Sequence, residues 1–91
     1  MSIIIRPEVK AFAEAMELKL RKKDAVREHW SRSMDSFLFT RAVEEIGELA
    51  GSFFHGTTEE ILDETTDVAN FMMMIFDNTT KKSRKIDQIH P

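Results

Sequence analysis

The sequence lacks the residues that build disulfide-stabilised or small β-sheet domains. Among its 91 residues there are no cysteines and no tyrosines, only three glycines and only two prolines. Without cysteine, a disulfide framework and a thiolate zinc site are excluded. The scarcity of glycine and proline argues against an all-β domain, which needs many turns. The length predicts one small domain over residues 1–91, and a domain of this size often gains stability by oligomerising.

Charge and hydropathy narrow the class of partner. The 13 basic and 16 acidic residues give a net charge of −3, whereas a nucleic-acid binder needs a basic face. No apolar run approaches the about 20 residues that span a bilayer, and the first five residues lack the basic start of a signal peptide. We therefore expect a cytoplasmic protein that contacts neither a membrane nor a nucleic-acid polymer.

Apolar residues at helical spacing predict an all-α fold. The expected helices cover residues 7–23, 36–55 and 58–78. Pro7 suits the first turn of a helix, Gly56 is a stop signal, and Thr57 followed by Glu60 fits a capping box. The last two helices would form an antiparallel hairpin that packs with the first helix as a bundle, completed by oligomerisation. We expect residues 79–91 to form a flexible tail.

The second expected helix has an apolar arc and an acidic arc. At about 100° per residue, the apolar arc contains Phe39, Val43, Ile46, Ala50 and Phe53. The far side gathers Glu44, Glu45 and Glu48, and no lysine interrupts them. Like charges one turn apart repel, and a solvated face would more often interleave lysines. The acidic arc is therefore a candidate functional surface.

The third expected helix carries carboxylates beside its apolar stripe. Val68, Phe71 and Ile75 define the stripe, and Glu64 occupies the position one turn before Val68. Asp67 lies at the edge of the same face. An isolated buried carboxylate costs several kcal/mol unless it is paired or bound to a metal, so this position calls for a cation.

In an antiparallel hairpin the two acidic segments would face each other. Glu45 and Glu48 would then lie opposite Glu64 and Asp67. Oxygen-only ligation favours Mg²⁺, Mn²⁺ or Ca²⁺ over zinc, and helical bundles host inward carboxylate sites. The residues alone leave two interpretations open, namely a metal site and a solvated acidic surface with one awkwardly placed carboxylate.

The two acidic segments resemble the signature of the MazG-like all-α nucleoside triphosphate pyrophosphohydrolases. They read Glu44-Glu45-Ile46-Gly47-Glu48 and Glu64-Thr65-Thr66-Asp67. Arg41-Ala42-Val43 precedes the first and Val68-Ala69-Asn70-Phe71 continues the second, as in family members. The resemblance covers about residues 8–78. It implies Mg²⁺-dependent hydrolysis of a (deoxy)nucleoside triphosphate to the monophosphate and pyrophosphate, with Mn²⁺ as a substitute ion, in a housecleaning role against non-canonical or surplus nucleotides.

The resemblance also implies individual roles. The metal ligands would be Glu45, Glu48, Glu64 and Asp67. Glu44 would orient or deprotonate the attacking water, and Asn70 matches a family position near the substrate. The family forms dimers and dimers of dimers, so we expect a homodimer or homotetramer. Longer members carry a further segment after the second motif, and here a second copy of the chain would complete the pocket.

Three more residues are candidates for substrate binding. Trp30, the single tryptophan, could stack on a base or plug the end of the bundle. Lys19 and Lys23 could reach phosphates, although cations at a helix C-terminus are also common on solvated helices.

Two alternative functions stay open. Phosphoribosyl-ATP pyrophosphohydrolases are of similar size, but they place a lysine and a glycine just ahead of the glutamate pair, where this chain has Ala42 and Val43. A catalytically silent helical interaction module would use the same carboxylates as a docking face for a basic partner.

Overall fold

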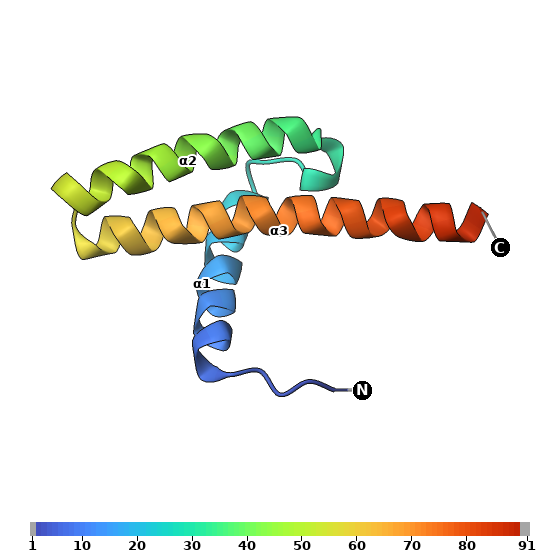
Figure 1. Cartoon of the computed structure of the whole chain (residues 1–91), viewed down its shortest axis with the longest axis horizontal. Helices are drawn as coiled ribbons and strands as arrows, with labels where there is room; N and C mark the ends of the chain where they lie inside the picture. Colours follow the sequence, from blue (N-terminus) through green and yellow to red (C-terminus); the bar gives the residue numbers. More distant parts are fainter. Residues whose placement is uncertain (1, 90–91) are drawn as a thin grey trace.

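The computed structural model describes residues 2–89, with side chains described for residues 2–84, and every regular element in that range is helical. The elements are α1 (Pro7–Asp24), the 3₁₀ helix η1 (Trp30–Arg32), α2 (Asp35–His55) and α3 (Thr58–Ile89). Figure 1 shows α2 and α3 side by side as an antiparallel hairpin, with α1 running across α3. The all-α prediction and the hairpin are confirmed. No helix in this range combines the length and apolar character needed to cross a bilayer.

The turn between α2 and α3 follows the predicted signals. The backbone N–H of Gly56 donates to the carbonyl of Ser52 at 2.9 Å. A Cβ on Gly56 would lie 2.8 Å from the Ser52 Cα, so a larger residue would force the turn apart. The hydroxyl of Thr57 accepts the backbone N–H of Glu60 at 3.2 Å, which caps the first turn of α3.

Helix α3 continues past its predicted end at residue 78 and reaches Ile89. The chain has no glycine or proline between Thr58 and Ile89, so nothing local stops the helix. Lys82 supports the extension because its Nζ contacts Oδ2 of Asp35 on α2 at 2.9 Å. Residues 79–89 of the expected tail are therefore helical, and residues 90–91 lie outside the described range.

The hydrophobic core is small. Within residues 2–84 its buried members are Leu38, Ala42, Phe71 and Met74, and Leu20 and Trp30 are among the partly buried side chains packed against them. Helix α1 contributes no buried residue, because its N-terminal half extends away from the hairpin (Figure 1). A core of this size supplies little stability for a domain of this length.

Helix α2 does not turn its predicted apolar arc toward α3. Phe39 and Phe53 in that arc are 57% and 66% exposed. The row that faces α3 contains instead Leu38, Ala42, Glu45 and Ser52, all buried. The apolar surface of α2 is thus wider than one partner helix can cover, and the arc stays on the outside of the hairpin.

Candidate functional site

A cavity of about 790 Å³ lies where α1 and η1 meet the hairpin. It is lined by six of the nine predicted site residues: Lys19, Lys23, Trp30, Glu45, Asp67 and Asn70. Two further cations of the wall, Arg27 and Arg41, were not among the predicted site residues. The cavity therefore combines carboxylates, cations and an aromatic ring in one place. Glu44, Glu48 and Glu64 are not part of its wall.

Glu45 is the most desolvated of the predicted metal ligands. It projects from α2 toward α3 and is only 9% exposed. Burial raises the pKa of Glu45, and the negative charges of Glu48 and Asp67 raise it further. Arg41 counters this only in part, since its Nη2 lies 3.6 Å from Oε1 of Glu45. The nearby guanidinium therefore compensates the buried carboxylate of Glu45 only in part.

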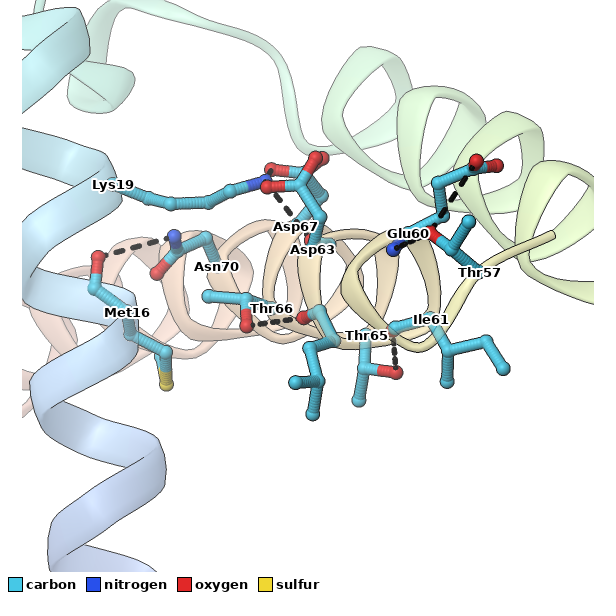
Figure 2. Close-up of polar contacts among 11 residues, drawn as sticks. Met16, Lys19, Thr57, Glu60, Ile61, Asp63, Thr65, Thr66, Asp67 and Asn70 are labelled. Atoms are coloured by element: carbon cyan, nitrogen blue, oxygen red, sulfur yellow. Dashed lines mark hydrogen bonds and ion pairs between the residues drawn. The ribbon is translucent and has the colours of Figure 1, made fainter. Parts of the chain in front are cut away.

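Asp67 is held by a lysine from another helix. Nζ of Lys19, on α1, lies 2.6 Å from Oδ1 of Asp67 and 2.7 Å from Oδ1 of Asp63 (Figure 2). It also donates to the backbone carbonyl of Asp63 at 2.9 Å. Burial alone would lower the pKa of Lys19, but the hydrogen bonds and charges of the two aspartates outweigh it and raise the pKa. Asp63 is not among the predicted site residues, although it lies one helical turn before Asp67.

Glu64 has a neutral protein partner. The Ser52 hydroxyl, on the row of α2 that faces α3, donates to Oε2 of Glu64 at 2.6 Å. The same hydroxyl lies 3.2 Å from the carbonyl of Glu48. This contact explains how a carboxylate is tolerated in the apolar stripe of α3. In the sequence, only the position of Ser52 one turn after Glu48 hints at this hydrogen bond.

Glu44 and Glu48 lie on the solvent side of α2. Both are exposed, and the Glu44 carboxylate pairs with the guanidinium of Arg41. Arg41 also stacks over the ring of Phe71, with Cζ 5.7 Å from the ring centroid. One arginine thus joins the predicted general base, a predicted metal ligand and the core.

The donor chemistry fits a hard divalent cation, although the described side chains do not form a closed shell. Glu45, Glu48 and Asp67 offer only oxygen, which Mg²⁺ prefers, and burial, followed by the charges of Glu48 and Asp67, raises the pKa of Glu45. Within residues 2–84, however, no three carboxylates or histidines converge as ligands of one ion. Asp67 is already paired with Lys19, and Glu64 already accepts a hydrogen bond from Ser52. An ion would have to displace these protein partners.

Trp30 lies both against the core and at the cavity. Its indole Nε1 donates to Oδ2 of Asp77 at 2.9 Å, and the ring of His29 packs on it with centroids 4.1 Å apart. The ring packs against the core and lines the cavity wall.

Asn70 anchors α1 to α3 through one half of its amide. Its Nδ2 donates to the backbone carbonyl of Met16 at 3.3 Å (Figure 2). Because a carbonyl only accepts, this contact fixes the orientation of the amide. The side-chain Oδ1 is buried and meets no hydrogen-bond donor among the described residues. Such an acceptor is costly to bury unsatisfied, and the atom has almost no surface open to solvent.

The site is thus assembled from α1, η1 and the hairpin. Lys23, from the last turn of α1, completes the cationic part of the wall. The structure brings Glu45 and Asp67 together with the predicted substrate residues, and leaves Glu44, Glu48 and Glu64 at the margin. No family model matches the chain, and no curated protein or solved structure matches it.

Proposed function

We propose that the protein hydrolyses a (deoxy)nucleoside triphosphate to the nucleoside monophosphate and pyrophosphate with Mg²⁺, or with Mn²⁺ in its place. The observation that carries this proposal is the composition of the cavity, where Glu45 and Asp67 lie with four cations and Trp30. Carboxylates suit a metal, cations suit phosphates and an aromatic ring suits a base. A metal-bound nucleotide is the ligand that needs all three.

Glu45, Glu48, Glu64 and Asp67 would hold the ion in this reaction. When bound, Mg²⁺ would neutralise the triphosphate and lower the pKa of a bound water. Glu44 would orient that water or accept its proton. Water supplies the oxygen that ends on the monophosphate, the bond between the α- and β-phosphates breaks, and pyrophosphate leaves. Hydrolysis needs no further reactant.

The remaining residues of the cavity would bind the substrate. Lys23, Arg27 and Arg41 would contact phosphate oxygens. Trp30 would stack on the base, and Asn70 would lie near the substrate. The role in the cell would be removal of non-canonical or surplus nucleotides in the cytoplasm, a proposal that comes from the resemblance of the acidic segments.

A homodimer or homotetramer is the second part of the proposal. Among the described side chains, four hydrophobic residues are buried in the core, while large apolar side chains such as Phe39 and Phe53 lie in solvent. Contiguous apolar surface of this kind marks contact with another chain. A second copy would cover the outer arc of α2 and so complete the bundle. It would also complete the wall of the open cavity.

The test is pyrophosphate release from a panel of canonical and modified nucleoside triphosphates with Mg²⁺. We expect Glu45→Gln and Asp67→Asn to lose at least about a hundredfold in rate, the scale of a lost metal ligand or its support. Glu59→Gln is the matched control, because Glu59 is an exposed acid in the first turn of α3. Activity that survives both site variants would remove these residues from the mechanism.

One observation favours the competing function, a silent interaction module. Lys19 and Ser52 already satisfy two of the predicted ligands without a metal. If no nucleotide releases pyrophosphate and titration calorimetry detects no saturable Mg²⁺ binding, the acidic surface is a docking face and the enzyme proposal is wrong.

A further inference from the structure

Lys19 forms the ion pair that ties α1 to the hairpin. Its ammonium contacts two carboxylate oxygens and one carbonyl oxygen at 2.6–2.9 Å. The Lys19 side chain is only 20% exposed. Most other ion pairs of the described residues join side chains three or four positions apart on one helix or turn, such as Arg21 with Glu17. Lys19 instead carries its charge from α1 into the first half of α3.

The oxygens around Lys19 resemble the surroundings of a bound ion. Three oxygens surround one positive charge, and one of them belongs to Asp67, a predicted metal ligand. A divalent ion on Asp67 would sit about 2.1 Å from its carboxylate oxygen. With Nζ of Lys19 at 2.6 Å from the same carboxylate, two cations would then lie within a few ångströms of each other. Their repulsion disfavours joint occupancy at this distance.

We propose that the Lys19 ammonium is a built-in competitor of the divalent cation: it neutralises Asp67 in the metal-free protein and leaves when the ion binds. The inference rests on the proposed function, because it takes Asp67 as a metal ligand. Its consequence is regulatory, since metal affinity depends on how firmly Asp63 retains the lysine. A flexible four-carbon stem lets the released ammonium turn toward a phosphate in the same cavity.

Release of Lys19 would also loosen α1. This helix has no buried residue, and its polar links to α3 in the described structure are the Lys19 contacts and the bond from Asn70 to Met16. Loss of the ion pair would leave α1 attached by the hydrogen bond from Asn70 to Met16 and by the packing of Leu20. Ion binding would therefore be reported by faster amide hydrogen exchange in α1.

Calorimetric titration with Mg²⁺ alone tests the competition. We expect Lys19→Met to lower the Kd for Mg²⁺ roughly three- to tenfold, the range of a modest ion pair that no longer competes. Lys22→Met is the matched control, because Lys22 is an exposed lysine of α1 that does not line the cavity. It should change the Kd by less than about twofold. Equal Kd values for Lys19→Met and the wild type would overturn the competition.

Asp63→Asn separates competition from simple charge removal. In the Lys19→Met background, loss of the negative charge can only weaken Mg²⁺ binding. With Lys19 present, the same change also weakens the hold on the lysine. We therefore expect Asp63→Asn to lower the Mg²⁺ affinity less than in the Lys19→Met background, or to raise it. The two substitutions would then be coupled in a double-mutant cycle. Additive effects would show that Lys19 acts only as a nearby charge and would overturn the inference. If Lys19→Met does not fold, Lys19→Gln, which also lacks the charge, takes its place in the same cycle.

Hydrogen exchange gives a readout independent of catalysis. Saturating Mg²⁺ should speed amide exchange in α1 of the wild type, whereas Lys19→Met should already exchange fast and respond little. Unchanged or slower exchange in the wild type would overturn the release of α1. If neither the wild type nor Lys19→Met binds Mg²⁺, the metal site of the proposed function fails as well. Binding by Lys19→Met alone would support the inference most strongly.

Discussion

Trp30 and Asp77 are joined by a hydrogen bond of 2.9 Å from the indole Nε1 to a carboxylate oxygen. The same oxygen lies 2.8 Å from Nζ of Lys81. Hydrogen bonds from Lys81 and then Trp30 lower the pKa of Asp77, so the acceptor is ionised at neutral pH. Since Asp77 belongs to α3 and does not line the cavity, the aromatic wall depends on a residue outside the site.

Asp77→Ala should therefore free the Trp30 ring. We expect a lower melting temperature, a red-shifted fluorescence emission and a weaker near-ultraviolet circular dichroism signal. Trp30 is the single tryptophan of the chain, so its emission reports this position alone. Asp77→Asn is the control, because its amide oxygen still accepts the indole N–H. Emission that is unchanged in Asp77→Ala would show that packing alone fixes the ring.

Acid should weaken the junction between α2 and α3 through Asp35. Hydrogen bonds from Lys82 and then Asn78 lower the pKa of Asp35 in the folded protein. The ordinary value for the unfolded chain is about 3.9. The contribution of Asp35 to the unfolding free energy is therefore complete above about pH 4 and is lost as the pH falls through the depressed folded value.

Thermal melts from pH 7 to pH 2 check this dependence. We expect Asp35→Asn to melt below the wild type at pH 7 and the two curves to converge at the acid end. High salt should narrow the gap at pH 7, because Lys82 is 67% exposed and its charge is screened. A gap that is constant with pH would mean that the carboxylate charge of Asp35 contributes nothing.

Glu45→Gln should stabilise the metal-free protein while it abolishes activity. Burial and then the charges of Glu48 and Asp67 raise the pKa of Glu45, so ionised Glu45 opposes folding at neutral pH. The amide removes that charge and keeps the shape of the side chain. Melting temperatures without metal should rise, and pyrophosphate release should fall. A lower melting temperature would show that the contact with Arg41 outweighs the repulsion.

The helices could be predicted from the sequence because their signals are local. Pro7, Gly56 and Thr57 mark helix ends through their own backbone chemistry, and the observed bounds of the first two helices agree with the predicted ones within one residue. The end of α3 could not be predicted in this way. No glycine or proline stops the helix after residue 78, but the contact that supports the extension joins Lys82 to Asp35, which are 47 positions apart in the chain.

The sequence predicts site residues only where the periodicity of a single helix determines which residues share a face. The placement of Glu45 opposite Asp67 followed from helical periodicity and an antiparallel turn. Ser52 and Asp63 escaped prediction because their roles arise when two helices meet at a particular rotation. A wide apolar surface such as that of α2 leaves this rotation open, since either half of it can pack inward.

The outer arc of α2 should be the surface on which two copies meet. Phe53 and Ile46 are 66% and 49% exposed, and an exposed phenylalanine can bury about 150–250 Å² on association. We expect the wild type to sediment as a dimer or tetramer, with a melting temperature that rises with protein concentration. Ile46→Glu and Phe53→Glu should each shift the mass toward the monomer, because the interface would bury an unpaired charge.

Thr40→Glu, on a neighbouring exposed face of α2, adds the same charge as a control and should leave the assembly intact. A wild type that is monomeric at all concentrations would contradict the assembly and leave the apolar arc without a function.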